Sequence, residues 1–325
     1  MSAVAITGGA SVVPDEAALP DEDAPAAVRA RIGRVERISA LALLAASAAL
    51  DDASACAAPV PAERAAMVLG TAFGCFLTNA EYQRRLDAGG PAAASPRLFA
   101  ATVSNAAAGE VAIALGLRGP GVTLTAGRVS GGVALGHAAA ALAAGRADAA
   151  IAGGADAMGP ALTRWIAATS FGVSRAAVDA AAFLVLEPLE PVRRGARVRG
   201  MLCGHAAGFE PTVDSPDAGR GLAVTIARAI DRAGIRPGAV DAIVSTVPPS
   251  LGALEARALA SALGRHDDPR RARIDAAGND GLAASGPHAV LQLLDHEPAG
   301  VIALVIEACA SGHVAACVVE TGGSG

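Results

Sequence analysis

The chain has 325 residues, of which 53% are hydrophobic but only 2% aromatic, and its formal net charge at neutral pH is -5. High hydrophobicity without a three-residue glycine period excludes a disordered or a collagen-like chain. The acidic balance and the scarcity of stacking rings argue against a sequence-independent nucleic-acid binder. The length allows two ordinary domains or one large core.

Short apolar runs typical of buried strands alternate with segments of helical periodicity along the first half. The predicted strands span residues 3–7, 66–71, 122–126, 147–153 and 183–189. The predicted helices span 34–50, 79–88, 102–117 and 130–144, and a surface loop rich in proline and acidic residues spans 11–29.

The second half repeats this alternation. Its predicted strands span 198–208, 240–245, 301–308 and 315–320, and its predicted helices span 219–234, 254–263 and 285–294. Strands alternating with helices imply an α/β fold. The shared rhythm suggests an internal duplication, so we expect two halves, residues 1–190 and 191–325.

Neither a metal site nor a membrane segment is expected. The five cysteines form no CxxC pair, and His205, His266, His288 and His296 show no metal-ligand spacing. The N-terminus lacks the basic-then-apolar order of a signal peptide. The longest charge-free stretch, 129–145, is typical of a buried helix rather than a membrane span. We therefore expect a soluble, cytoplasmic protein.

The most informative segment is 117–158, which predicts a strand, a sharp turn, a buried helix and a second strand. A residue at such a turn lies at a helix N-terminus, where an enzyme would place a nucleophile. The sequences LTAGRVSGG and, further on, AIAGGADAM resemble the β-ketoacyl synthase family of the thiolase superfamily. Residues 66–117 and 183–187 and the first strand support the resemblance. It implies a thiolase-like fold, a five-layered α-β-α-β-α sandwich of two similar halves.

The catalytic residues of that family do not carry over. Ser130-Gly131 and Gly136-His137 match the family motif and place Arg128 at the nucleophile position. Thr246 follows the strand that precedes the first family histidine, and Asp280 lies where the second would be. Because a guanidinium cannot serve as the acyl nucleophile, we expect no catalytic residue of the condensing reaction in this chain.

The resemblance therefore implies a chain-length factor, the degenerate partner of a catalytic ketosynthase in type II polyketide synthases. The family's aromatic type usually has Gln at the nucleophile position, so Arg128 and the segment ahead of it are more similar to polyene and aryl-polyene systems. The implied partners are a ketosynthase in a heterodimer and an acyl carrier protein. No cofactor is expected to be bound, and the carrier's phosphopantetheine arm would be a transient ligand of the complex.

The resemblance also implies where the acyl tunnel meets the subunit interface. The residues at this place are Phe99, Thr102, Ser104, Asn105, Ala106, Ala107, Ala108 and Glu110. Short-chain synthases carry bulky side chains here, and alanine in their place leaves open volume. We therefore expect space for an extended, rigid acyl chain.

Several alternatives stay open. Arg128 must be paired if it is buried, and Asp280 and Glu110 are the candidate partners. Ser130 is either an alternative nucleophile or, more in keeping with its residue type, a helix N-cap. Arginine clusters at 193–194, 197, 199 and 270–273 could dock an acidic carrier protein or be simple surface charge. The alternative functions are an acyltransferase or decarboxylase with a rearranged site around Ser130, Cys309 or His313, and a purely structural ketosynthase partner.

Overall fold

The computed structural model describes residues 3–14, 19–55, 57–169, 176–190, 195–213, 215–264, 270–273 and 279–322. Its ten strands form one mixed sheet in the order β3-β2-β4-β5-β1-β6-β10-β9-β7-β8. The strands are β1 (Val4–Val12), β2 (Ala65–Gly70), β3 (Gly121–Leu124), β4 (Ala149–Asp156), β5 (Ala180–Pro188), β6 (Gly200–Phe209), β7 (Ala242–Ser245), β8 (Arg270–Arg273), β9 (Ile302–Ala308) and β10 (His313–Thr321).

The first five strands and the last five have the same topology. Strand β2 runs parallel to β3 and β4, and β5 and β1 follow in antiparallel pairing. In the same way β7 runs parallel to β8 and β9, and β10 and β6 follow in antiparallel pairing. The two groups are joined where β1 pairs with β6 from Val4–Leu202 to Ile6–Gly200. Hydrogen bonding therefore continues from one group of strands into the other.

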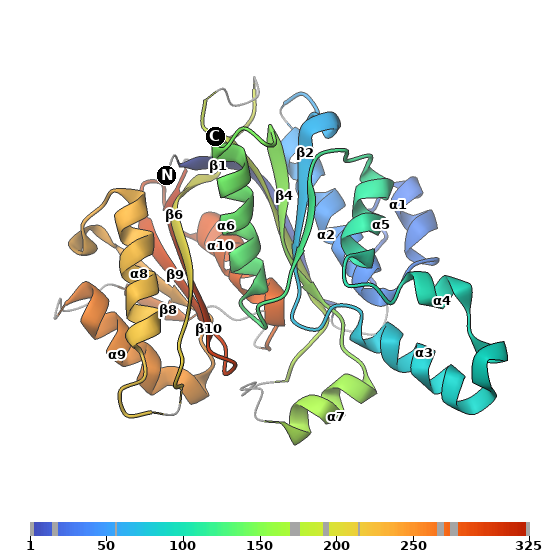
Figure 1. Cartoon of the computed structure of the whole chain (residues 1–325). Coiled ribbons are helices and arrows are strands. Elements are labelled where there is room, and N and C mark those ends of the chain that lie inside the picture. Colours follow the sequence, from blue (N-terminus) through green and yellow to red (C-terminus); the bar gives the residue numbers. More distant parts are fainter. Residues whose placement is uncertain are drawn as a thin grey trace.

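Helices cover the sheet and fill the space between its two groups of strands (Figure 1). They are α1 (Ala26–Ile32), α2 (Arg37–Ser54), α3 (Phe76–Gly89), α4 (Pro96–Ala100), α5 (Ala106–Leu115), α6 (Ser130–Ala143), α7 (Pro160–Ala168), α8 (Arg220–Ala233), α9 (Gly252–Leu263) and α10 (Ser285–His296). One hydrophobic cluster joins α6 and α10 to strands of both groups. A second packs α2 and α5 on the first group, and a third packs α8 and α9 on the second.

Most of the strands contribute residues to two of these clusters, because side chains along a strand point to opposite faces. In β2, for example, Ala66 and Val68 face the central helices, whereas Met67 and Leu69 face α2. The tight packing of the central helices depends on glycine as well as alanine. A Cβ on Gly131 of α6 would lie 2.0 Å from the backbone oxygen of Ala283, so only glycine lets α6 approach this closely.

The predicted elements are present, with changes at their ends. Strand β1 extends to Val12, beyond the predicted end at residue 7, and helix α1 begins inside the predicted loop. The helix predicted from 102 begins only at Ala106. Helices α1, α4 and α7 and strand β8 were not predicted. Among the described residues, no helix combines the length and apolar character that a bilayer crossing requires.

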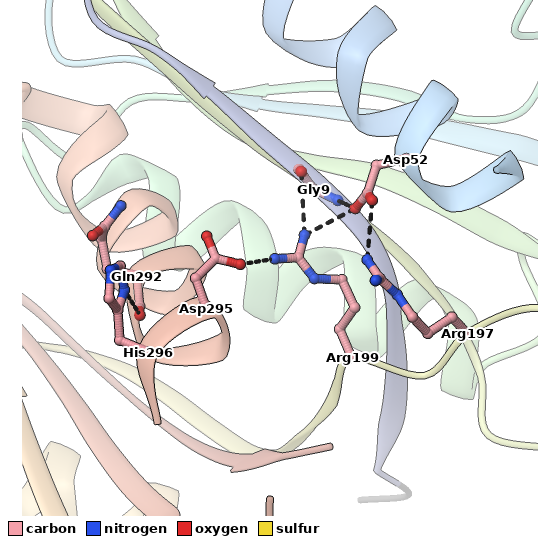
Figure 2. Close-up of polar contacts among 7 residues, drawn as sticks. All are labelled: Gly9, Asp52, Arg197, Arg199, Gln292, Asp295 and His296. Atoms are coloured by element: carbon pink, nitrogen blue, oxygen red, sulfur yellow. Dashed lines mark hydrogen bonds and ion pairs between the residues drawn. The ribbon is translucent and has the colours of Figure 1, made fainter. Parts of the chain in front are cut away.

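An ion-pair network ties the segment before β6 to the first half and to α10. Figure 2 shows Arg199 between Asp52, near the end of α2, and Asp295 of α10. Arg199 donates to Oδ2 of Asp52 over 2.9 Å and also pairs with Asp295. Asp52 accepts a further bond from the backbone nitrogen of Gly9 over 3.0 Å. The predicted half boundary at 190/191 adjoins residues 191–194, which lie outside the described part of the chain.

Candidate functional site

Arg128 lies in the turn between β3 and α6, at the buried end of the central helix. It is 3% exposed. The preceding Gly127 has a φ of 59°, a left-handed conformation that favours glycine. A Cβ on Gly127 would lie 2.9 Å from Sγ of Cys309, so glycine is also required for space. This turn therefore directs the Arg128 side chain into the space between the first and the second group of strands.

The structure brings together the three residues that the sequence analysis placed at the family's catalytic positions. Arg128 donates from Nη1 to the backbone oxygen of Thr246 over 2.6 Å and from Nη2 to Oδ1 of Asp280 over 2.9 Å. A longer bond of 3.3 Å joins Nη1 to the backbone oxygen of Ala308. Of the two candidate ion partners, Asp280 is the one that Arg128 contacts. Glu110 instead pairs with Arg31, with 2.6 Å between Oε2 and Nη2.

Asp280 also fixes the turn that leads into α10. Its Oδ1 accepts from the backbone nitrogen of Leu282 over 2.9 Å and from Oγ of Ser285 over 3.4 Å. Leu282 has a φ of 53°, the one positive φ outside glycine in the described residues. A branched side chain in this conformation costs about 1–3 kcal/mol. The carboxylate of Asp280 therefore holds both the guanidinium and a strained backbone turn.

Glu307 of β9 is a second buried acid beside this cluster, and the sequence analysis did not single it out. Burial raises its pKa to about 8, although the charge of Arg128 opposes the shift. A Cβ on Gly132 of α6 or on Gly286 of α10 would lie within 2.3 Å of its carboxyl oxygens. Glu307 Oε2, Arg128 Nε and Thr246 Oγ1 have no hydrogen-bond partner among the described residues. The first turns of both central helices therefore enclose a largely neutral carboxyl group.

Ser130 is not the helix N-cap that its residue type predicts. Helix α6 begins at Ser130 itself, Val129 is the N-cap residue, and no side chain caps this end. The Ser130 hydroxyl accepts from the nitrogen of Ala126 over 2.7 Å and lies 2.9 Å from the oxygen of Thr71. These bonds connect the start of α6 to the residue that follows β2. The hydroxyl therefore bonds to backbone atoms outside α6 and does not cap its own helix.

Asp156, at the end of β4, is a further buried acid that holds the site together. Its carboxylate accepts from Oγ1 of Thr71, from the nitrogens of Ala72 and Phe73, and from the nitrogen of Ala283. Burial raises its pKa to about 6. An acid directly after a buried apolar strand and a Gly-Gly pair was the signal in the sequence that could have found it.

The predicted tunnel residues divide into exposed and buried groups. Phe99 is 60% exposed, and its ring lies 5.7 Å from that of Tyr82. Ser104 and Asn105 are exposed and Ala106 is half-buried, whereas Ala107 and Ala108 pack in the chain's own core against α2. Thr102 accepts a bond from the thiol of Cys75 through its backbone oxygen, over 2.8 Å. The exposed surface of this segment is therefore concentrated before and at the start of α5.

The remaining candidates are mostly engaged elsewhere. Cys309 is fully buried, and His313 lies 3.0 Å from Oγ of Ser311 through its Nδ1 atom. Arg197 and Arg199 form ion pairs with Asp52. Residues 193 and 194 and the side chains of 270–273 lie outside what the structure describes. Within the described ranges, no group of three or more His, Cys, Asp or Glu side chains could hold a metal ion.

Comparison with known proteins agrees with this architecture. Residues 2–184 match the family profile described as the N-terminal domain of β-ketoacyl synthase. The chain belongs to the β-ketoacyl synthase family. A 3-oxoacyl-[acyl-carrier-protein] synthase 2 from Synechocystis sp. is 29% identical over 258 residues, which cover 72% of this chain. The aligned part spans 62% of that relative, less than two thirds of its length.

Solved structures of ketosynthases share the fold of this family member. The ishigamide ketosynthase/chain length factor matches with a TM-score of 0.80 at 24% identity, over 99% of this chain and 100% of the other. A ketosynthase in complex with a type II polyketide synthase acyl-carrier protein and bound to the hexaketide matches with a TM-score of 0.82 at 19% identity. It covers 98% of this chain and 99% of the other. At these identities the matches establish the fold alone.

Proposed function

We propose that this ketosynthase-family protein is a non-catalytic, chain-length-factor-like subunit. It pairs with a catalytic ketosynthase and shapes the acyl tunnel in which a polyketide or polyene chain is elongated on an acyl carrier protein. The observation that carries this proposal is the buried Arg128, which occupies the nucleophile position and is paired with Asp280 over 2.9 Å.

The chemistry of condensation supports a non-catalytic role. The reaction needs a thiolate to hold the acyl chain and donors for the oxyanion that develops on the carbonyl. Arg128 is no nucleophile, its Nη atoms already donate to Thr246, Ala308 and Asp280, and Asp280 is engaged as an acceptor. The partner subunit would therefore supply the cysteine and histidines, and the phosphopantetheine arm would visit the partner's site.

Two features of the first half support a heterodimer. Strand β3 is the terminal strand of the sheet and pairs only with β2 among the described strands, which leaves its other edge for a partner. Helix α5 packs beside β3, and Ile113 of this helix is more than half exposed, as are Phe99 and Val103 ahead of it. Exposed large apolar side chains of this kind are found at protein interfaces. In this proposal the half formed by residues 1–190 carries the interface and the half formed by 191–325 completes the core.

Two observations weigh against the alternative of a rearranged acyltransferase or decarboxylase. The Ser130 hydroxyl is buried and bonded to backbone atoms. Cys309 is buried and packs beneath Gly127. Neither nucleophile is presented to a substrate, so a purely structural role is the stronger competitor.

Product length in the reconstituted pair separates a tunnel-shaping subunit from a purely structural one. This chain is co-expressed with a candidate type II ketosynthase, and co-purification of the two is expected. Ala106→Phe, at the half-buried start of α5, is then expected to shorten the products, because it fills volume at the interface. The matched control is Ala260→Phe on the exposed face of α9, which should leave the length unchanged. Unchanged product length with Ala106→Phe, or a stable and active homodimer of this chain, would contradict the proposal.

A further inference from the structure

Three buried polar atoms near the Arg128–Asp280 pair have no hydrogen-bond partner among the described residues. They are Nε of Arg128, Oγ1 of Thr246 and Oε2 of Glu307. The three residues are 3%, 4% and 3% exposed, respectively. Almost all buried polar atoms in native proteins are bonded to another protein group or to ordered water, because an unpaired one costs free energy. These three atoms therefore need a partner.

Thr246 and Glu307 lie side by side on neighbouring strands. Strands β7 and β9 pair in parallel, and the nitrogen of Thr246 extends this pairing by donating to the oxygen of Ile306 over 3.1 Å. The residues two positions earlier, Val244 and Val305, both face the central helices. Side chains two positions apart on a strand point to the same face, so the Thr246 hydroxyl and the Glu307 carboxyl point into the same layer.

The guanidinium of Arg128 spans the ends of these two strands. Its Nη1 donates to the backbone oxygens of Thr246 and of Ala308, the residue after Glu307, and its Nη2 donates to Asp280. Burial raises the pKa of Glu307 to about 8 and the charge of Arg128 opposes this shift, so the two side chains are near neighbours. Nε carries one N–H and cannot accept, so it needs an acceptor in this region.

The first turns of the two central helices close the region without supplying a side chain. Gly132 of α6 and Gly286 of α10 face Glu307, and a Cβ on them would lie 1.7 and 2.3 Å from its Oε1. A larger residue at either position would displace the carboxyl group. Since glycine has no side chain to bond with the unpaired atoms, their partner does not come from these two positions.

We propose that an ordered water molecule is bound between Arg128, Thr246 and Glu307 and bridges their three unpaired atoms. Buried waters make about three hydrogen bonds to otherwise unpaired polar groups, which is the number that this set offers. Water accepts from the Nε–H, and it can donate to or accept from the hydroxyl and the neutral carboxyl.

Other ligands of this size fit the charges less well. A metal cation would be repelled by the guanidinium of Arg128. An anion would add a second negative charge beside that guanidinium, which Asp280 already neutralises over 2.9 Å. A neutral molecule that both donates and accepts meets neither difficulty.

The inference does not depend on the proposed subunit role, since every group that holds the water belongs to this chain. It adds to that role, because water bound to Nε of Arg128 occupies a donor that could otherwise stabilise the oxyanion of an acyl intermediate.

A crystal structure of this chain, at a resolution that shows ordered waters, tests the inference directly. The expected result is electron density for a water within about 3.2 Å of at least two of the three atoms. Absence of such density, or protein groups bonded to these atoms in its place, would overturn the inference and would leave the proposed pairing with a ketosynthase unaffected.

The variant Thr246→Val provides a second test, because the sign of its effect depends on the water. Valine keeps the shape of threonine and removes the hydroxyl. If the hydroxyl binds the water, its loss should raise the equilibrium constant of unfolding about fivefold in urea denaturation, whereas removal of an unpaired hydroxyl would leave the constant unchanged or lower it.

The matched control for this variant is Thr123→Val. Oγ1 of Thr123 is also buried and unpaired among the described residues, but it belongs to β3, at the end of the sheet remote from β7 and β9. Its replacement should leave the unfolding constant unchanged or lower it. An unchanged or lower constant in Thr246→Val, or an equal rise in the control, would overturn the inference.

Discussion

Arg128 and Asp280 form an ion pair of 2.9 Å in which the two side chains are only 4% and 7% exposed. The two residues stand 152 positions apart and lie shortly before the central helices α6 and α10. A charge buried this deeply is stable only with a counter-charge. The two residues that the sequence analysis aligned with the family's nucleophile and second histidine therefore depend on each other for their burial.

Removal of one partner should expose this dependence. Asp280→Asn is expected to lower the free energy of unfolding by about 3–5 kcal/mol, because it leaves a buried guanidinium without its counter-charge. Chemical denaturation monitored by circular dichroism measures the change. The matched control is Asp148→Asn, which breaks a pair with Arg64 whose side chains are more than half exposed and should cost less than about 1 kcal/mol. Equal losses of unfolding free energy in the two variants would contradict the burial of the Arg128–Asp280 pair.

Stability should fall as the pH rises, and Glu307 should account for much of the fall. Burial raises the pKa of Glu307 from its ordinary 4.5 to about 8, so the folded state favours the neutral acid. That contribution is fully present below pH 4.5 and is lost as the pH rises through about 8. Glu307→Gln keeps the shape without the titration, so its unfolding free energy should vary less between pH 5 and about 9.

The comparison for Glu307 is unfolding free energy against pH for three proteins. Glu63→Gln, a change at an exposed residue paired with Arg118, is expected to follow the wild-type curve. A Glu307→Gln curve parallel to the wild type would show that Glu307 is ionised throughout this range and that the enclosure by Gly132 and Gly286 does not neutralise it.

Because α6 lies close to the turn before α10, replacement of Gly131 by a larger residue should lower the free energy of unfolding. The added Cβ of Gly131→Ala would lie 2.0 Å from a backbone oxygen, which cannot move without shifting the turn at Ala283. A loss of about 1–3 kcal/mol is expected. Gly109→Ala in α5 has open space around its Cβ and should be neutral or stabilising by about 0.5 kcal/mol. Thermal unfolding of the isolated chain distinguishes the two, and similar midpoints would contradict the close approach.

The ion pairs of Figure 2 differ in burial, so neighbouring arginines should differ in effect. Arg199 is 10% exposed and contacts two carboxylates, whereas Arg197 is 43% exposed and contacts one. Arg199→Ala is expected to lower the free energy of unfolding by about 2–4 kcal/mol, because Asp52 loses its inner partner. Arg197→Ala should cost less than about 1 kcal/mol. Urea unfolding of both variants provides the measurement, and a larger effect at Arg197 would refute the assignment.

Much of the fold could be predicted from the sequence because most strands are compact apolar runs and most long helices are apolar segments bounded by glycine or polar residues. The α/β class and the similar alternation in the two parts of the chain followed from that pattern, whereas the order of the strands in the sheet did not. The short helices α4 and α7 were missed because each spans fewer than ten residues and begins at a proline, a residue that is also typical of loops. Strand β8, with the sequence Arg-Arg-Ala-Arg, carries no apolar pattern at all.

The site was predicted in part. Three family motifs named Arg128, Thr246 and Asp280 as the residues at the nucleophile and histidine positions, and the structure places Arg128 in contact with the other two. The choice of Asp280 over Glu110 as ion partner could not be predicted, because it depends on how the two halves pack. Glu307 was missed for the same reason, since only the folded chain shows an acid enclosed by distant backbone. Asp156 was missed although its place after an apolar run and a Gly-Gly pair was a usable signal. The cap predicted at Ser130 was wrong because its hydroxyl bonds to the backbone of Thr71, just after β2, and of Ala126 and Gly127.

Intact-mass analysis after exposure to an acylated carrier protein tests the central claim most directly. The purified pair of this chain and its ketosynthase is incubated with the acyl carrier thioester, and both chains are weighed. The closed cluster of Arg128, Thr246 and Asp280 predicts that the ketosynthase gains the mass of one acyl group while this chain keeps its unmodified mass. An acyl adduct on this chain would contradict the account.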